Sequence, residues 1–377
     1  MYRLGFDAKR LFNNFTGLGN YSRTLLFNLG QYFPDNAYFL YTPKVKKNSE
    51  THYFLTSPSY SVKMPKLMPK AYWRTVGITP QLKQQKIQLY HGLSHEIPMG
   101  LEKANIPSVV TIHDLLYKHF PDQYAWADRQ IYDFKFRYAC QHANKIVAIS
   151  EATKKDIIHF FDVPAEKIEV IYQTCHDRFM QERSKKTLAE VKAKYHLPDA
   201  FLFYVGSVIE RKNLLGLVKA LDLLPKDLQL PLVVVGSRSE YQIQVSEYAK
   251  KANLEDKIIY IEPTFHDLSA LYQQAKVFIY PSFAEGFGIP VLEALFSKTP
   301  VVTSNCSSLP EAAGPGAYLA DPHAPEDIAA GIEKILTDDD YRETLIKEGF
   351  EYAQQFQGEP LVYQMMELYE KVLKRKF

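Results

Sequence analysis

Two carboxylates lie on either side of a glycine-rich turn in the second half of the chain, within VFIYPSFAEGFGIPVLEALFSKTPVVTS (277–304). Glu285 follows an apolar run typical of a buried strand, and Pro290 favours the first turn of a helix that would contain Glu293. Glycines beside Glu285 expose backbone N–H groups, so the turn can bind sugar hydroxyls through carboxylates and amides. The alternative is a glycine-rich turn with one capping and one surface glutamate. We disfavour it because the pattern of the whole stretch is unusually specific.

A second candidate site is the stretch YVGSVIERKNLLGLVKAL (204–221). Gly206 ends a predicted strand, and Arg211 and Lys212 fall where the next helix begins. Asn213 can cap that helix. Two cations beside a helix N-terminus make a phosphate subsite, because arginine binds two oxygens and lysine adds a point charge. A solvated basic pair on a surface helix is the alternative for this stretch alone.

The third candidate is the glycine-rich stretch FTGLGNYSRTLLFNL (15–29). Gly17 and Gly19 allow the backbone to approach a ligand, and a helix follows at once. A helix N-terminus attracts phosphate. A bare tight turn explains two glycines equally well, so this pattern indicates little by itself.

These stretches follow short apolar runs that alternate with helical segments. Most of the runs are continuous, as in strands covered on both faces of a parallel sheet, so the pattern predicts doubly wound α/β sheets. The strands are too many for one sheet, and the charged stretch 173–199 suits a break. We predict two Rossmann-like domains, over 1–180 and 181–357, with a helix at 358–377 packing back on the first. The predicted strands are 2–8, 38–42, 87–92, 108–114, 145–150 and 168–172, then 201–207, 231–237, 257–263, 276–282 and 300–304.

Composition excludes several classes of protein. The 377 residues carry a formal net charge of +2, which argues against a nucleic-acid binder. Three widely spaced cysteines lack zinc-ligand spacing and suit a reducing cytoplasm. The N-terminus shows no secretory signal, and no apolar run is long enough to span a membrane, so we expect a cytoplasmic protein.

With these motifs the chain resembles glycosyltransferase family 4, the retaining group 1 enzymes of the GT-B type, over nearly all of its length. The second half carries the more specific motifs, and the first half adds TGLGNYSRTL, TIHD and AISEAT. The motifs of the second half are G-x5-K-N at Gly206–Asn213, E-x7-E at Glu285–Glu293 and TSNCSSLPEAAG at Thr303–Gly314.

The resemblance implies two Rossmann-like doubly wound parallel-sheet domains facing across a cleft, with the acceptor domain over 1–180 and the nucleotide-sugar donor domain over 181–357. It also assigns roles to the motif residues. Glu293 would bind the donor ribose, Arg211 and Lys212 the diphosphate, and the segment Thr264–Leu268 the base. The implied catalytic residues are His113, Glu285, Arg211 and Lys212. The implied donor-binding residues are Gly17, Gly19, Gly206, Ser207, Phe287, Gly288, Ile289 and Glu293. Many relatives carry an arginine where this chain has Ser207, so Arg211 must supply more of the positive charge.

The implied reaction moves a mannose- or glucose-type hexose from a GDP- or UDP-linked sugar to a sugar or lipid-linked sugar, in polysaccharide or glycoconjugate synthesis. The family implies retention of configuration, and no residue stands out as a covalent nucleophile. We expect no cofactor and no obligatory metal, since an obvious D-x-D motif is missing. Two alternatives stay open: a GT-B epimerase acting on UDP-sugars, and a non-catalytic sugar-binding scaffold.

The stretch KMPKLMPKAYWRT (63–75) bears on the acceptor side, because it interleaves basic with apolar residues. Such a segment can bind an anionic membrane surface, which would suit a lipid-linked acceptor at the inner membrane face. Pro65 and Pro69 interrupt any long helix. A solvated loop is therefore the favoured interpretation, with peripheral membrane contact as the alternative. The basic residues are Lys63, Lys66, Lys70 and Arg74, and the apolar ones are Met64, Leu67, Met68, Tyr72 and Trp73.

Overall fold

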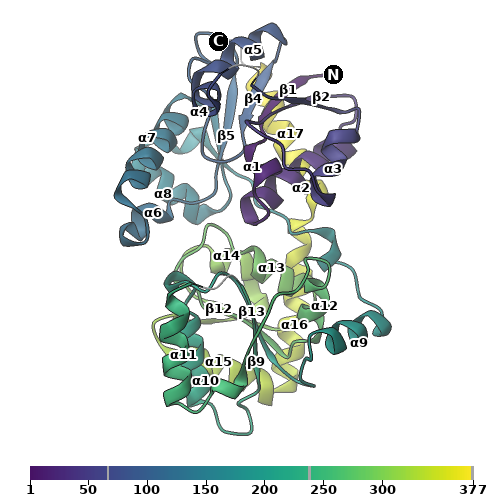
Figure 1. Ribbon diagram of the computed structural model, residues 1–377, viewed down its shortest axis with the longest axis vertical. Coiled ribbons are helices and arrows are strands. Elements are labelled where there is room, and N and C mark those ends of the chain that lie inside the picture. Colours follow the sequence, from purple (N-terminus) through teal and green to yellow (C-terminus); the bar gives the residue numbers. More distant parts are fainter. Residues whose placement is uncertain (66–67, 237–238, 375–377) are drawn as a thin grey trace. The chain divides into compact units, whose positions relative to one another are not determined.

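The computed structural model describes residues 1–65, 68–236 and 239–374. The chain divides into two compact units, one formed by residues 1–174 with 356–377 and the other by residues 175–355. Each unit contains one parallel sheet covered by helices (Figure 1).

The first unit is built on a seven-stranded sheet in which all neighbouring strands are parallel, in the order β3-β2-β1-β4-β5-β6-β7. Six of these strands lie in predicted runs. The prediction missed β3, an edge strand whose sequence YSVK mixes polar with apolar residues because only part of it is buried. The strands are β1 (Arg3–Asp7), β2 (Ala37–Tyr41), β3 (Tyr60–Lys63), β4 (Leu89–Gly92), β5 (Ser108–Ile112), β6 (Lys145–Ala148) and β7 (Ile168–Val170).

Helices cover both faces of this sheet and enclose two separate cores. One core joins the sheet to α2 and α17, and the other joins it to α5, α7 and α8. The α-helices are α1 (Lys9–Asn13), α2 (Gly17–Tyr32), α3 (Ser49–Thr56), α4 (Lys70–Tyr72), α5 (Ile78–Gln84), α6 (Leu116–His119), α7 (Trp126–His142), α8 (Glu151–Phe161) and α17 (Gly358–Lys374). Shorter turns are the π-helical η1 (Trp73–Gly77) and the 3-10 turns η2 (Pro121–Gln123) and η3 (Ala165–Lys167).

The second unit repeats this design with six parallel strands in the order β10-β9-β8-β11-β12-β13. The five predicted runs form β8 to β12, although Ser237 of the predicted strand 231–237 lies outside the described residues. The sheet comprises β8 (Leu202–Val205), β9 (Leu232–Val235), β10 (Ile258–Ile261), β11 (Val277–Tyr280), β12 (Val301–Ser304) and β13 (Ala317–Ala320).

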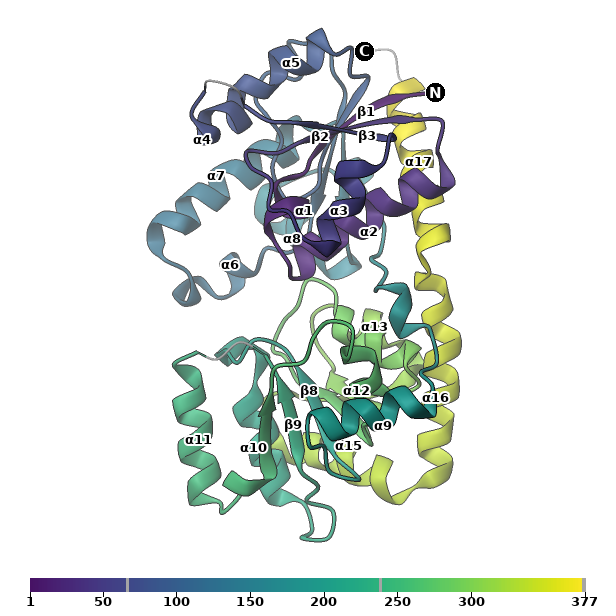
Figure 2. The ribbon, with the colours of Figure 1, turned by 45° about the vertical axis from the view of Figure 1, so that its right-hand side comes forward.

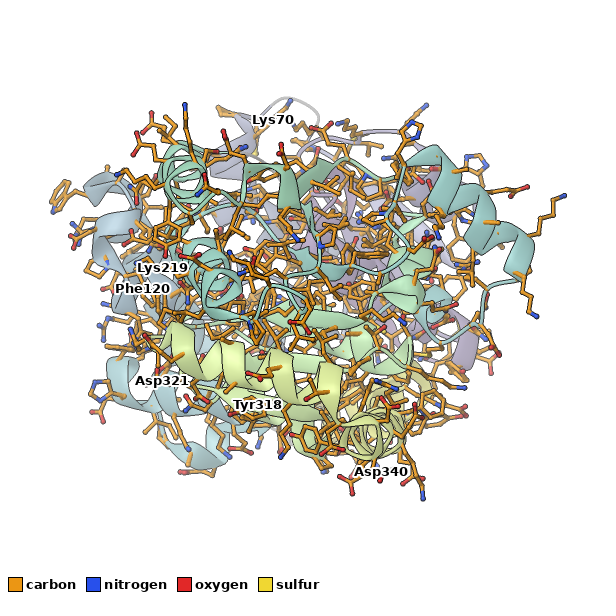
Figure 3. All side chains as sticks on the ribbon, turned by 90° about the horizontal axis from the view of Figure 1, so that it is seen from below. Lys70, Phe120, Lys219, Tyr318, Asp321 and Asp340 are labelled. Carbon is orange, nitrogen blue, oxygen red and sulfur yellow. The ribbon has the colours of Figure 1, made fainter. Side chains whose placement is uncertain are left out.

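The prediction also missed the edge strand β13, whose short AYLA sequence gives a weak apolar signal. Its outer edge is tied to helix α15 (Pro325–Thr337). The Tyr318 hydroxyl donates to Asp327 Oδ1 at 2.7 Å, and the backbone N–H of Asp321 donates to Asp327 Oδ2 at 2.8 Å. Tyr318 and Asp321 both lie along this helix in Figure 3. Both missed strands are therefore edge strands that are fixed by tertiary contacts.

The other α-helices of this unit are α9 (Lys185–Lys194), α10 (Leu214–Leu223), α11 (Tyr241–Lys251), α12 (Leu268–Gln274), α13 (Ile289–Phe296), α14 (Leu309–Ala313) and α16 (Asp339–Ala353). The 3-10 turns are η4 (Asp177–Phe179), η5 (Glu210–Lys212), η6 (Glu255–Lys257) and η7 (Gly314–Gly316), and η8 (Gln354–Phe356) leads to α17.

Helix α17 lies beside α2 in the first unit, although the whole second unit separates the two helices in the chain (Figure 2). The sequence predicted a helix here from its apolar spacing, and that helix is confirmed through Lys374; residues 375–377 of the predicted 358–377 lie outside the described residues. Leu361, Met365 and Leu368 are buried. The helix therefore contributes an apolar face to the first unit's core.

A buried chain of hydrogen bonds links α17 to the middle of that sheet. The Tyr369 hydroxyl lies 2.6 Å from His91 Nδ1, and His91 Nε2 lies 2.8 Å from Thr111 Oγ1. Thr111 in turn bonds the Tyr21 hydroxyl at 3.0 Å. Burial lowers the pKa of His91 to about 3, so its ring is neutral and needs a polar partner at each nitrogen.

The stretch 63–75 differs from the solvated loop that the sequence favoured. Trp73 is fully buried, and only 12% of the Arg74 side chain is exposed. Both residues begin the π-helical turn η1, which packs on the sheet. Lys66 and Leu67 lie outside the described residues. The alternation of basic and apolar residues therefore gave no sign that Trp73 and Arg74 are buried by tertiary packing.

Replacing Tyr369 by phenylalanine should destabilise the protein by about 1–3 kcal/mol, because His91 Nδ1 would lose its partner in an apolar surrounding. Equilibrium urea unfolding measures the change. Tyr363→Phe on the same helix is the matched control, since Tyr363 is 49% exposed. Equal stability of the two variants would contradict the importance of the buried bond.

Candidate functional site

The predicted site residues of the second unit gather at the carboxyl edge of its sheet. Strands β8 and β11 pair in parallel, so the loops that follow them begin at the same edge. Gly206 follows β8, and Glu285 lies in the loop after β11. Ligands of open α/β sheets bind outside this edge.

Glu285 forms ion pairs with both predicted cations. Its Oε1 lies 3.0 Å from Arg211 Nη1 and 2.8 Å from Lys212 Nζ. The Tyr280 hydroxyl donates to the same oxygen at 3.1 Å, and Lys212 Nζ also bonds this hydroxyl. Only 11–15% of each of the three charged side chains is exposed, so the cluster is largely withdrawn from water.

The cluster fixes the protonation state of Glu285. Burial by itself would raise the pKa of this carboxyl, but the charges of Lys212 and Arg211 outweigh it and lower the pKa to about 2. Burial and the charge of Glu285 together raise the pKa of Tyr280 well above its usual value. At neutral pH the site therefore holds a carboxylate, two cations and a neutral phenol.

Backbone and side-chain bonds hold the loop around Glu285 in place. The hydroxyl of Ser307 accepts from Glu285 N–H at 3.2 Å, and Ser308 Oγ donates to Phe287 O at 2.7 Å. Asn213 caps α10 as predicted: its Oδ1 accepts from Gly216 N–H at 3.1 Å, while its amide donates to Pro281 O. The cation loop and the glutamate loop are thereby joined.

Two glycines of the site lie where an added side chain would be crowded. Gly288 has φ of +129°, and a Cβ there would lie 3.0 Å from side-chain atoms of Ala312 and Leu309. A Cβ at Gly206 would lie 3.1 Å from Lys212 Cδ, so this glycine leaves room for the lysine stem. Gly288 precedes α13 and caps its first turn, since its carbonyl accepts from Val291 N–H at 2.9 Å and from Leu292 N–H at 3.2 Å; Ile289 is the first residue of the helix.

Glu293 occupies a different environment, on the buried side of α13. Its Oε2 accepts from the Tyr272 hydroxyl at 2.9 Å. Burial raises the pKa of Glu293 to about 8, despite the opposing effects of Tyr272 and of the charge of Arg178. The two glutamates of the E-x7-E element therefore differ in charge at neutral pH.

The segment predicted to hold a base, Thr264–Leu268, lies near η4. The Arg178 guanidinium lies 4.1 Å from the centre of the Phe265 ring, and His176 contacts that ring edge-on. Thr264 Oγ1 donates to Asp267 Oδ2 at 2.8 Å. The Phe265 ring and the Arg178 guanidinium therefore lie together in the second unit, and the charge of Arg178 also acts on Glu293. Ser207, the position where many relatives carry arginine, is exposed.

His113 lies in the first unit, directly after β5, and is buried. Its Nε2 donates to Leu93 O at 2.8 Å, and its Nδ1 accepts from Gln173 Nε2 at 2.9 Å. Burial and the neighbouring His95 lower the pKa of His113 to about 3. The ring is therefore a neutral imidazole whose two nitrogens both have protein partners, and its predicted role at the sugar stays a prediction.

Gly17 and Gly19 begin helix α2, as expected. A Cβ at Gly19 would come within 1.8 Å of Asn14 O, whereas Gly17 has open space around it. The Asn14 side chain accepts from the N–H groups of Thr16 and Gly19, both at 3.0 Å. Packing against Asn14 thus explains Gly19, and the exposed Gly17 is the one that leaves room for a ligand.

Three residues of these clusters were not predicted from the sequence. Tyr272 and Tyr280 contact the two glutamates, but in the sequence they resemble ordinary core aromatics in a helix and a strand. Arg178 was assigned to a charged linker. A tyrosine at the carboxyl end of a buried strand, next to proline, was the one available signal.

The described residues contain neither a membrane-spanning helix nor a metal-binding cluster of side chains. Across 1–65, 68–236 and 239–374, no helix has both the length and the apolar character to cross a bilayer. In the same part of the chain, no group of three or more histidine, cysteine, aspartate or glutamate side chains is arranged to hold a metal ion.

Two protein-family models match the chain. Residues 187–352 match glycosyl transferases group 1, and residues 22–176 match glycosyltransferase family 4. Together the two matches cover most of both units.

Curated relatives and solved structures agree with these models. O-antigen chain mannosyltransferase B of Escherichia coli is 34% identical over 77% of this chain and 76% of its own length. The serotype-specific mannosyltransferase WbdA of the same species is 30% identical over 68% of this chain, which is 33% of its length. The Anabaena protein Alr3699/HepE, solved with UDP, superposes with a TM-score of 0.78 at 16% identity, covering 98% of this chain and all of that one. Such a superposition supports the GT-B fold.

Replacing Glu293 by glutamine should change how stability depends on pH. The pKa of Glu293 is raised from 4.5 to about 8 in the folded protein, so folding retains a proton that the unfolded chain releases. Wild-type stability should therefore fall as pH rises from 4.5 through 8, by up to about 1.4 kcal/mol per pH unit from this group.

Urea unfolding of both proteins between pH 5 and 9 measures this difference, which should grow in favour of Glu293→Gln. Glu348→Gln, at an exposed position on α16, is the control and should follow the wild type. Parallel stability profiles for wild type and Glu293→Gln would refute the neutral buried carboxyl.

Proposed function

The chain belongs to the group 1, family 4 glycosyltransferases, and on that premise we propose that it is a mannosyltransferase of O-antigen-type polysaccharide synthesis. It would transfer mannose from a nucleoside diphosphate sugar to a glycan acceptor, with retention of configuration. The mannosyl group and the polysaccharide context are taken from the names of its curated relatives. GDP and UDP are both candidate donor nucleotides.

The observation that carries this proposal is the cluster of Glu285, Arg211 and Lys212 at the carboxyl edge of the second sheet. Breaking the anomeric C–O bond leaves negative charge on a diphosphate. Cations that are already fixed in a water-poor site stabilise that charge without reorganising during the reaction. Glu285 orients both cations, and its remaining acceptor capacity can bind a hydroxyl of the transferred sugar.

The protonation states limit the mechanism. Glu285, with its pKa lowered to about 2, is ionised at neutral pH and cannot serve as a general acid. Glu293, with its pKa raised to about 8, can donate its proton to a ribose oxygen while it stays buried. From the family resemblance we propose that the acceptor hydroxyl attacks the anomeric carbon from the front face, without a covalent sugar intermediate. Its proton passes to the departing diphosphate, whose remaining charge Arg211 and Lys212 stabilise.

Replacing Lys212 by alanine should lower kcat about 10²- to 10³-fold, because a preorganised cation is lost from the leaving group. The measurement is nucleoside diphosphate release from GDP-mannose or UDP-glucose, supplied separately, with a panel of methyl glycosides as acceptors. Lys347→Ala, at an exposed position on α16, is the matched control and should keep full activity.

Two outcomes would count against the proposal. Full activity of Lys212→Ala would remove the cluster from the reaction. A change in the donor sugar without any acceptor would favour an epimerase. A thermal-shift series with GDP and UDP tests donor binding independently, since a bound ligand raises the melting temperature.

Peripheral membrane contact is proposed for the surface around α4. Met64, Met68 and Tyr72 are 50–56% exposed, and Lys70 lies among them. Exposed apolar side chains beside a cation suit the interface of an anionic membrane. A lipid-linked acceptor would be within reach of a protein bound there.

Sedimentation with vesicles of phosphatidylcholine and phosphatidylglycerol at low salt tests this surface. The wild type should pellet with the vesicles, and a Met64→Glu, Tyr72→Glu double variant should stay in solution. Ile243→Glu is the control, because Ile243 is 61% exposed in the second unit. Wild-type protein that does not pellet would discard the membrane proposal.

A further inference from the structure

Tyr280 is a buried tyrosine that contacts two of the charged side chains in the second unit's site. It is the last residue of β11, and only 1% of its surface is exposed. Its hydroxyl donates to Glu285 Oε1 at 3.1 Å and accepts from Lys212 Nζ. A phenylalanine would fill the same apolar space without a polar group to satisfy, so packing does not explain the hydroxyl.

The sheet fixes Tyr280, whereas the charged residues of the cluster lie outside the strands. The backbone carbonyl of Tyr280 accepts from Thr303 Oγ1 on β12 at 2.8 Å. Its ring stacks on Phe278 of the same strand, with 5.9 Å between the ring centres. The two cations belong to the short turn η5, and the carboxylate lies in the loop before α13. Because strands hold side chains more precisely than loops do, Tyr280 gives both loops a fixed point on the sheet.

Lys212 is the member of the cluster that most needs such a fixed point. A lysine ammonium ends a flexible four-carbon stem, whereas an arginine guanidinium is a planar fork with a geometry of its own. Arg211 Nη1 donates to Ala284 O at 2.5 Å and lies 3.0 Å from Glu285 Oε1. Lys212 Nζ lies 4.8 Å from the centre of the Tyr280 ring and bonds its hydroxyl. Tyr280 and Glu285 thus set the direction of the ammonium together.

A neutral phenol suits this position because one hydroxyl can accept and donate at once. Burial and the charge of Glu285 raise the pKa of Tyr280 well above its usual value, so it keeps its proton at neutral pH. Its oxygen faces Lys212 and its proton faces Glu285. The phenol therefore orients both charges without adding negative charge to a cluster that must stabilise a diphosphate.

We propose that Tyr280 is a positioning residue for sugar transfer, which orients the Lys212 ammonium toward the leaving diphosphate; this proposal rests on the function proposed above. When the anomeric C–O bond breaks, its electron pair stays on the diphosphate oxygen, so the charge facing Lys212 grows. A cation that already points the right way stabilises the transition state more than the intact donor. Loss of the hydroxyl should therefore act on kcat more than on donor binding.

The test is Tyr280→Phe, which removes only the hydroxyl. Its kcat should be about 10- to 100-fold lower, the range for a hydrogen bond to a charged group. Nucleoside diphosphate release from GDP-mannose or UDP-glucose, with the methyl glycoside panel, measures kcat. In calorimetric titrations the Kd of GDP or UDP, which carries the full charge of the leaving group, should rise about 10-fold. The Kd of the intact donor should change less than about 3-fold.

Tyr318→Phe is the matched control. The Tyr318 hydroxyl also donates to a carboxylate, at 2.7 Å from Asp327 Oδ1, but on the edge strand β13. This variant should keep the kcat and the Kd values of the wild type. Circular dichroism and urea unfolding of each variant establish that it is folded under the assay conditions.

A double-mutant cycle tests whether Tyr280 acts through Lys212. In the Lys212→Ala background, Tyr280→Phe should change kcat and the Kd of GDP or UDP less than about 3-fold, because the ammonium that it orients is gone. Equal fold-losses in both backgrounds would show that Tyr280 acts by another route and would overturn the proposal.

Wild-type kcat and nucleotide Kd in folded Tyr280→Phe would also overturn it. That result leaves the proposed function standing, since the wild type still binds nucleotide and releases it from the donor. A wild-type protein that binds neither GDP nor UDP would contradict the proposed function and the role of Tyr280 together.

Discussion

One carboxylate that stays ionised inside the protein is the constraint on which the second unit's site depends. Burial alone would favour a neutral Glu285, and the two cations that prevent this are held by the same contact. The rest of the loop serves this arrangement. Gly206 leaves space for the lysine stem, and Tyr280 bonds both Lys212 and Glu285. Removing either sign of charge would leave the other unpaired and largely desolvated, which is why the cluster is a single structural unit.

The same sheet edge holds a carboxyl group in the opposite state. Glu293 lies eight residues after Glu285, has a phenol as its hydrogen-bond partner and is neutral at pH 7 because of burial. The site thus offers a ligand two different carboxyl groups: the ionised Glu285, which can only accept hydrogen bonds, and the protonated Glu293, which can donate one. His113 in the first unit differs from both glutamates. Burial keeps its ring neutral, and each ring nitrogen has a hydrogen-bond partner in the protein.

The sequence predicted the inner strands and the charged residues of the second unit, because continuous apolar runs and glycine-flanked charges are local patterns. It missed the edge strands β3 and β13, because their mixed or small residues give a weak apolar signal. The edge strands β7 and β10, whose sequences are more apolar, were predicted. It also missed the tyrosines beside both glutamates, Tyr272 in a helix and Tyr280 in a strand, because their contacts depend on tertiary packing rather than on spacing in the sequence. Trp73 and Arg74 were assigned to a solvated loop, because a π-helical turn buried on a sheet has no periodic signature in the sequence.

Helix α17 has a consequence for how the protein is made. All strands of the first unit and its helices α1 to α8 are synthesised by residue 174, but one of its two cores includes side chains of α17 from 361 to 372. While the second unit is being translated, the apolar side chains of the first unit that pack against α17 therefore stay uncovered. Because domains fold as units during synthesis, the leading unit can complete this core only after the whole second unit and α17 have been made.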